Sequence, residues 1–345
     1  MTTANAGVKS IPWYRTPLNR ETLTQLNTRN DFKGFLQAGS HLGLLIATGT
    51  TACLMAGKWP WWALLALLFL HGTIHAFIIN GFHELIHGTV FNSKILNKVF
   101  LSLFSFFGMY NPVAFKASHN EHHKFTLHPP ADLEVVLPIK LTLIGFLKIA
   151  FINPQGLKYV FANHIRLSTG LLEGAWEQSL FPDSAPALRR DLILWSRIIL
   201  YGHILIAAVS MALGFWMVTV VITLAPFYGQ GIQWLCNNTQ HTGLTNNVPD
   251  FRLCCRTIYL NPVLEYLYWN MNYHTEHHMY AAVPCYNLRR LNKLIRHDLP
   301  YCPNGLIDTW RQISRILNTQ KLEPTYQYRA ELPPFQPSIQ TAETS

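Results

Sequence analysis

The sequence predicts an all-α integral membrane protein, with four transmembrane helices in two hairpins and a cytosolic helical cap that holds a metal site. Only 13% of the 345 residues are charged and 49% are hydrophobic, whereas soluble proteins carry about 25% charged residues. Four apolar stretches each approach the roughly 20 residues that cross a bilayer. Three histidine clusters lie outside the stretches chosen as helices, and they predict the metal site.

The first hairpin is predicted from two apolar stretches, residues 36–56 and 61–80, which Lys58 and Pro60 separate. Both stretches have the length of a membrane-spanning helix. The polar residues 1–35 precede them and contain five basic residues. We therefore expect residues 1–35 to form a cytosolic N-terminal segment.

The second hairpin is predicted from residues 192–213 and 215–234, which meet in a tight turn at Gly214. Both stretches are again long enough to cross a bilayer. Pro226 has no backbone N–H to donate, so we expect it to kink the fourth helix.

The other segments are assigned to the membrane surface or to the cap. Residues 99–110 are apolar but too short to cross, and they predict a re-entrant or interfacial piece. Residues 138–152 mix apolar and basic side chains, which predicts a helix lying on the membrane surface. One membrane domain with its catalytic cap is expected over residues 36–330. The remainder, residues 331–345, is rich in Pro, Ser and Thr and predicts a disordered tail.

The histidine clusters have the spacing of metal ligands on helices. Residues at i, i+3 and i+4 share one helix face, and the motifs HELIH, HNEHH and HTEHH use that spacing. Imidazole is a common neutral ligand for transition metals. Eight imidazoles are too many for one ion, so the clusters predict a dinuclear centre. Ordinary surface or core histidines are the alternative, but two HxxHH motifs in one chain are seldom coincidental. The clustered residues are His83, His87, His119, His122, His123, His274, His277 and His278.

Four crossings would place both termini and all three clusters on one side of the membrane. The basic residues agree, because all 27 Lys and Arg residues except Lys58 and Arg197 lie in segments assigned to that side. By the positive-inside rule, this side is the cytosol. The net charge of +9 then follows mostly from topology. It forms no dense patch of the kind that binds nucleic acid.

The ligand types favour iron. Zinc usually closes its shell with three or four ligands and needs no neighbouring ion. Copper sites usually recruit Cys or Met, and neither lies in the clusters. We expect the six cysteines to be reduced thiols, since no CxxC pair is present. Iron beside a membrane predicts oxygen activation on an apolar substrate, for which the protein supplies orientation and exclusion of water.

The segments HELIHGTVF, HNEHH and YHTEHHMY resemble the three histidine boxes of the membrane fatty acid desaturase family. The resemblance covers about residues 75–295, and the superfamily also contains hydroxylases and carotenoid ketolases. It implies a centre of two Fe ions, O2 as co-substrate and a separate electron donor of the ferredoxin or cytochrome b5 type. It also implies that Asn237, in a motif resembling NxxxH, holds a metal-bound water, a role that the neighbouring Asn238 could take instead. The implied metal residues are His83, His87, His119, His122, His123, Asn237, His241, His274, His277 and His278.

Several carboxylates are candidates to support the metal ligands, because ligating histidines usually donate their second N–H to a carboxylate or carbonyl. Glu84, Glu121 and Glu276 lie inside the boxes, and a plain salt bridge is the alternative for each. Asp132 and Glu134 follow the second box and are weaker candidates.

Two further groups of side chains have competing interpretations. His71 and His75 form another HxxxH motif inside the second span, where hydrogen-bonded packing is the preferred interpretation over metal ligation. A basic helix face follows the third box. It predicts either contact with solvent and anionic lipid or docking of an acidic electron carrier. That face consists of Arg289, Arg290, Lys293 and Arg296.

The expected function is oxygen-dependent desaturation of fatty acyl chains of a membrane lipid or an acyl thioester. The alternative is hydroxylation or ketolation of a lipid, terpenoid or carotenoid by the same kind of centre. A histidine-rich metal transporter is a third possibility, but transporters place their ligands near the bilayer midplane. A multi-pass protein of the bacterial inner membrane or the endoplasmic reticulum is expected.

Overall fold

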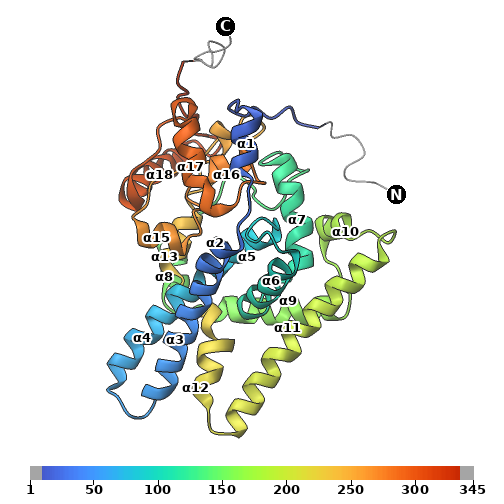
Figure 1. Ribbon diagram of the computed structural model, residues 1–345, viewed down its shortest axis with the longest axis vertical. Coiled ribbons are helices and arrows are strands. Elements are labelled where there is room, and N and C mark those ends of the chain that lie inside the picture. Colours follow the sequence, from blue (N-terminus) through green and yellow to red (C-terminus); the bar gives the residue numbers. More distant parts are fainter. Residues whose placement is uncertain (1–9, 335–345) are drawn as a thin grey trace.

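The computed structural model describes residues 10–334. Over this range the chain is helical and contains no β-strand, which confirms the all-α prediction. The molecule is elongated (Figure 1). The turns at residues 56–60 and 213–215 lie at one end, whereas α1 (Arg20–Leu26) and α18 (Gly305–Leu322) lie toward the other.

Three helices are long and apolar enough to cross a membrane, and they coincide with the first three predicted stretches. The first, Asp31–Met55, consists of α2 (Asp31–Gly34), the π-helical η1 (Phe35–Gly39) and α3 (Ser40–Met55); the second, Trp61–Ile86, consists of α4 (Trp61–Ala76) and α5 (Ile78–Ile86); the third is α11 (Pro186–Ala212). The apolar composition of these segments explains their position, since a helix satisfies its own backbone hydrogen bonds in lipid.

The fourth predicted stretch is not one continuous helix. It is divided into α12 (Trp216–Val218), the π-helical η2 (Thr219–Thr223), the 3₁₀ helix η3 (Ala225–Phe227) and α13 (Gly231–Asn237). The expected kink at Pro226 is therefore a full interruption, helped by Gly229, whose φ is +69°. We call residues 216–237 the returning segment, because it runs back from the turn at the end of α11 (Figure 1) and packs against α3 and α4.

The returning segment approaches α4 at a glycine. A Cβ built on Gly72 would lie 2.3 Å from Cδ2 of Tyr228 and 2.5 Å from the Tyr228 carbonyl oxygen. Such distances are far inside van der Waals contact, so only glycine allows this approach. The interruption after η3 thus lets the returning segment pack closely against α4.

The cap is built from shorter helices around a hydrophobic core. Phe82 of α5, Phe104 of α6 and Trp269 are fully buried together in it. A Cβ on Gly81 would lie 2.3 Å from the Phe104 ring, so this glycine lets α5 and α6 pack closely. The remaining helices are α6 (Lys94–Gly108), α7 (Pro112–Phe125), α8 (Leu143–Ala150), α9 (Pro154–Ser168), α10 (Gly174–Leu180), α14 (Phe251–Cys254), α15 (Pro262–Leu267), α16 (His274–Met279), α17 (Cys285–Ile295) and η4 (Arg296–Asp298).

Two of these helices correspond to the segments expected at the membrane surface. The segment 99–110 falls mostly within α6, which packs against α5. The segment 138–152 contains α8, whose Leu143 and Ile144 are exposed. An exposed apolar face of this kind is typical of a helix that lies in the lipid headgroup region. Most of the expected disordered tail, residues 335–345, lies outside the described residues.

Candidate metal centre

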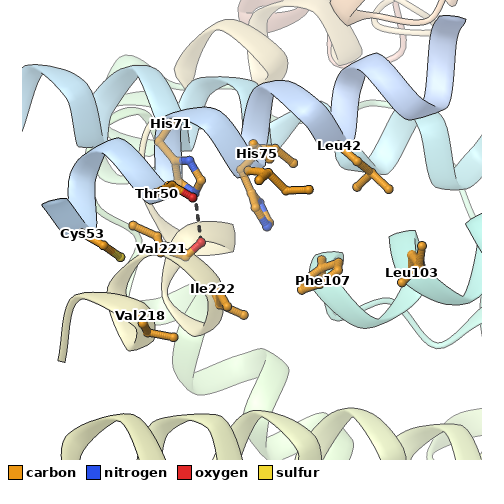
Figure 2. A pocket seen from close by; sticks show the side chains of 13 residues that line it. Leu42, Thr50, Cys53, His71, His75, Leu103, Phe107, Val218, Val221 and Ile222 are labelled. Atoms are coloured by element: carbon orange, nitrogen blue, oxygen red, sulfur yellow. Dashed lines mark hydrogen bonds between the residues drawn. The ribbon is translucent and has the colours of Figure 1, made fainter. Parts of the chain in front are cut away.

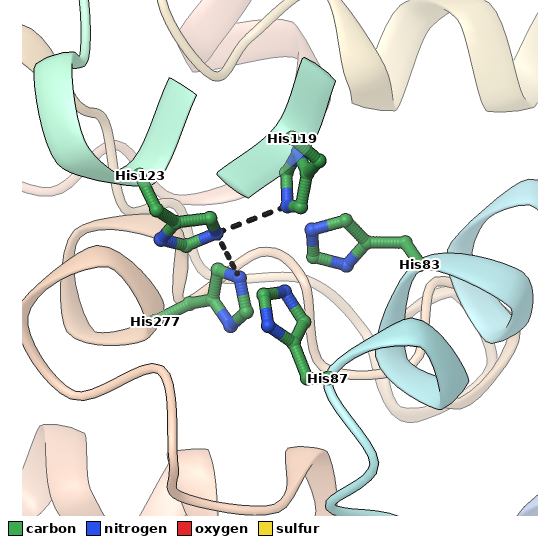
Figure 3. A group of neighbouring side chains, drawn as sticks. All are labelled: His83, His87, His119, His123 and His277. Carbon is green, nitrogen blue, oxygen red and sulfur yellow. Dashed lines mark hydrogen bonds between the residues drawn. The ribbon is translucent and has the colours of Figure 1, made fainter. Parts of the chain in front are cut away.

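Three helices bring five histidines together into what we call the first histidine group. His83 comes from α5 and His87 is the residue that follows it, His119 and His123 come from α7, and His277 comes from α16. One ring nitrogen of each lies within 4.8 Å of the others. Figure 3 shows these rings pointing toward a common centre.

Helix α7 is positioned for this role by its first turn. Asn111 caps the helix, because its side-chain oxygen accepts hydrogen bonds from the backbone N–H groups of Val113 and Ala114 at 3.0 and 3.1 Å. The amide nitrogen of Asn111 donates to the Leu192 carbonyl and to the Ser196 hydroxyl, both at 2.8 Å. The Asn111 side chain therefore caps the N-terminus of α7 and also joins α7 to α11 by hydrogen bonds.

A second histidine group adjoins the first. His241, His274 and His278 each place one ring nitrogen within 4.8 Å of the others and of the Cys255 thiol. The His122 ring lies beside them, with its centroid 5.1 Å from that of His241 and 5.0 Å from that of His278. Since His123 and His278 stack with centroids 4.5 Å apart, the two groups are neighbours.

The ring nitrogens in both groups face one another. The Nε2 atoms of His241 and His274 are 2.9 Å apart, and those of His274 and His278 are 3.1 Å apart. In the first group the Nε2 atoms of His119 and His123 are 3.0 Å apart. The Nε2 atom of His274 faces two other nitrogens, and it carries at most one proton, so it cannot form a hydrogen bond to both as a donor. Convergence of this kind fits a pair of transition-metal ions, which would accept every lone pair at once.

Burial keeps these imidazoles neutral, which is the form that binds metal. Desolvation lowers the pKa of His123, His274 and His278 well below the ordinary range. It lowers the pKa of His241 to about 3. A buried imidazolium is disfavoured because its charge loses hydration.

Two carboxylates hold histidines of the groups. Nδ1 of His122 lies 2.8 Å from Asp132 Oδ2, and Nδ1 of His119 lies 2.7 Å from Glu134 Oε1. A carboxylate accepts, so each ring donates from Nδ1 and leaves Nε2 free as a ligand atom. Burial has the largest single effect on the pKa of His122 and lowers it, but the hydrogen bond to Asp132 and the negative charges of Asp132 and Glu134 together outweigh burial, so the pKa is raised.

The glutamates inside the boxes differ from one another. Glu84 is buried, with Oε1 at 3.3 Å from His83 Nδ1 and 3.5 Å from His277 Nδ1. Glu121 instead forms a surface ion pair with Lys124. Glu276 accepts hydrogen bonds from the Thr257 hydroxyl and the Asn292 amide, neither of which is a metal-ligand candidate. Asp132 and Glu134 therefore form hydrogen bonds to ligand histidines. Glu84 only lies beside two of them, and its carboxylate oxygens have no hydrogen-bond partner among the described residues.

Asn237 does not belong to either group. It is exposed at the end of α13, whereas the histidine groups are buried. Asn238 donates from its side-chain amide to the Trp234 carbonyl at 2.9 Å. That Asn237 holds a metal-bound water therefore stays a prediction from the sequence, which the exposure of the residue at the end of α13 does not favour.

Cys255 is the residue that sequence reasoning missed. All six cysteines are free. Cys255 packs in the hydrophobic core, as an ordinary apolar side chain would, but its thiol also lies within 4.8 Å of the ring nitrogens of the second group. No spacing in the sequence indicates this, because Cys255 lies just after α14, far from the histidine motifs. The backbone carbonyl of its neighbour Cys254 also accepts from His241 Nδ1 at 2.7 Å.

The alternative ligands His71 and His75 lie outside both groups.

The sequence profile of the fatty acid desaturase family matches residues 59–309, a range that contains every residue of both histidine groups. A comparison with curated protein sequences finds no match. The extent of the profile match over an all-helical chain with two converging histidine groups shows that this chain belongs to the fatty acid desaturase family.

Proposed function

We propose that this protein is an oxygen-dependent di-iron oxidoreductase that desaturates fatty acyl chains of a membrane lipid or an acyl thioester. The observation that carries the proposal is the convergence of the histidines into two adjoining groups at the end of an apolar helix. Membership of the desaturase family supports the same chemistry.

The two groups suggest how the ligands are divided. One iron would be held by the first histidine group, and the second by His122, His241, His274 and His278, with the Cys255 thiol as a fifth ligand. Bound iron would supply the activation of O2 that removal of hydrogen from an unactivated chain requires. The chain itself would supply rigid ligand placement and a dry site, because the group residues are nearly all buried.

Hydroxylation or ketolation of a lipid, terpenoid or carotenoid is the alternative, since the same ligands would serve it. The position of the chain relative to the irons would decide the outcome by proximity. A transporter is disfavoured because both groups lie at or beyond the end of the α4–α5 span, rather than at its middle.

The electrons would come from a separate carrier of the ferredoxin or cytochrome b5 type. We assign its docking to the basic face of α17, whose Arg289, Arg290 and Lys293 are exposed. An acidic carrier would be steered to such a face. We further propose that the protein is multi-pass, crosses four times and keeps its catalytic side in the cytosol.

The test is to express the chain in a host membrane and to measure iron content and lipid composition together. We expect about two irons per chain and new unsaturated or hydroxylated acyl chains. His274→Ala should remove the products and lower the iron content. His297→Ala is the matched control, because that histidine is exposed and outside both groups. Fully iron-loaded protein with unchanged lipids would contradict the proposal.

A further inference from the structure

A cavity lies in the membrane-spanning part of the molecule, apart from the histidine groups. It is bounded by α3, α4, α6 and the returning segment, and its volume is about 550 Å³. Pockets for small molecules commonly occupy about 300–1,000 Å³. Figure 2 shows its walls, with Leu103 and Phe107 of α6 facing Val218, Val221 and Ile222 of the returning segment.

The lining excludes ligands with charged groups at this depth. None of the thirteen residues that line the cavity is Asp, Glu, Lys or Arg. A carboxylate or phosphate placed here would lose its hydration with no cation to replace it. The cavity is thus suited to an apolar skeleton.

Two imidazoles interrupt the apolar lining, and they are not equivalent. His71 is satisfied at both ring nitrogens: Nδ1 lies 2.7 Å from the Thr48 hydroxyl, and Nε2 lies 2.9 Å from the Val221 carbonyl. His75 is 4% exposed, yet its Nε2 has no hydrogen-bond partner among the described residues. Buried ring nitrogens are normally paired, so the free Nε2 indicates an absent partner.

The free nitrogen is directed into the cavity. Figure 2 shows the His75 ring extending from α4 toward the open space between Ile222 and Phe107. Ile46 and Thr50 of α3 also line the cavity and are exposed on the outer surface of the helix. The cavity therefore opens sideways, toward the position of the lipid, and an apolar ligand could enter from the bilayer.

We propose that this cavity binds an apolar molecule that carries a hydroxyl group, with the hydroxyl on His75 Nε2. A hydroxyl can both donate and accept, so it pairs with either tautomer of a neutral imidazole, whereas a carbonyl pairs with only one. The uncharged, apolar lining selects the rest of the molecule. This site is separate from the metal centre and does not depend on the proposed reaction.

Photolabelling tests the site directly on the purified full-length protein in detergent micelles. The probe is a long-chain alcohol that carries a photoreactive diazirine, and mass spectrometry locates the label. We expect the label on α3 and on residues 216–223. An unlabelled alcohol should compete roughly tenfold better than an alkane of the same length, which is the effect of one buried hydrogen bond. A fused-ring terpenoid alcohol forms a second arm, which shows whether a flexible chain or a rigid skeleton is preferred.

Two variants separate the hydrogen bond from the cavity. His75→Leu should make the alcohol and the alkane equal competitors, and His75→Gln should restore part of the preference for the alcohol. Ile222→Trp should fill the cavity and reduce all labelling, which keeps the test valid if His75→Leu does not fold. The proposal is overturned if wild-type protein shows no preference for the alcohol, if the preference survives in His75→Leu, or if Ile222→Trp labels normally. Iron content, measured in parallel, distinguishes this failure from a failure of the metal centre.

Discussion

At the scale of single residues, some of the ligand histidines are held by carboxylates that belong to neither histidine group. Asp132 illustrates this role. Its Oδ2 accepts from His122 Nδ1 and from the Leu127 backbone N–H, both at 2.8 Å, and its Oδ1 accepts from the Glu134 backbone N–H at 2.9 Å. The carboxylate thus orders the chain after α7 and orients one imidazole at the same time. Partners of this kind raise the basicity of a ligand and fix its tautomer.

Replacing Asp132 by Asn should therefore weaken metal retention without unfolding the protein. We expect iron affinity to fall about 10- to 100-fold, since the neutral amide holds the His122 N–H less strongly. Competition with a chelator, followed by the iron content per chain, measures the effect. Glu121→Gln is the matched control, because among the described residues Glu121 forms its ion pair with the exposed Lys124 alone. Equal iron retention in Asp132→Asn and the control would show that the carboxylate is structural.

Cys255 gives the second prediction at this scale. An ion placed among the nitrogens of the second group would have the Cys255 sulfur within reach, and thiolate is a strong ligand for such ions. Cobalt(II) reconstitution should therefore give a thiolate-to-cobalt charge-transfer band in the near ultraviolet. The band should vanish in Cys255→Ser and persist in Cys254→Ser. Its absence from the wild-type protein would exclude the sulfur as a ligand.

The residues that sequence reasoning found and missed differ in one physical respect. The box histidines are grouped by helical spacing, which any helix preserves, so their convergence could be predicted. Asn237 ends α13, where the direction of a side chain depends on the register of the last turn. Cys255 is brought in by tertiary packing of a short non-periodic segment, and no local pattern carries that information.

At the scale of elements, hydropathy predicted α3, α4 and α11, and Pro226 predicted a kink in the returning segment, but neither predicted that this segment is divided into four short helices. Apolar composition assigns a stretch to lipid without revealing whether its helix is continuous. The break after η3 coincides with close packing on α4, where Gly72 meets Tyr228. These contacts lie far apart in the sequence, so only the assembled fold contains them.

Helix α17 gives the prediction that belongs to this scale. Leu288, Leu291 and Ile295 face the core, and Arg290 and Lys293 face outward. Reversing both charges, as Arg290→Glu with Lys293→Glu, should slow reduction by an acidic carrier roughly tenfold at low salt and flatten its salt dependence. Stopped-flow reduction at several ionic strengths measures this. The same reversal at the exposed Arg311 and Arg315 of α18 is the control, and equal rates for both double variants would remove α17 as the docking face.

At the scale of the whole molecule, the metal centre constrains the topology more strongly than hydropathy does. His83 lies at the end of the α4–α5 span, and His241 and His274 follow α11 and the returning segment. These residues lie in adjoining groups on one side of the helices. With three crossings, α11 would carry the rest of the chain to the opposite side and separate the groups. We therefore predict that the broken returning segment brings the chain back across, even though it is not one long helix.

Reporter fusions test this topology in cells. An alkaline phosphatase inserted after Gly57 or after Gly214 should be active on the far side of the membrane, because those turns lie at the end of the molecule opposite the cap (Figure 1). A fusion after Glu323, at the end of α18, should be inactive there, while a fluorescent protein at the same position should fold in the cytosol. The predominance of basic residues on the cap side favours this orientation. Activity of the phosphatase after both Gly57 and Glu323 would mean that an even number of crossings separates these positions, and that would be incompatible with two histidine groups that share one side.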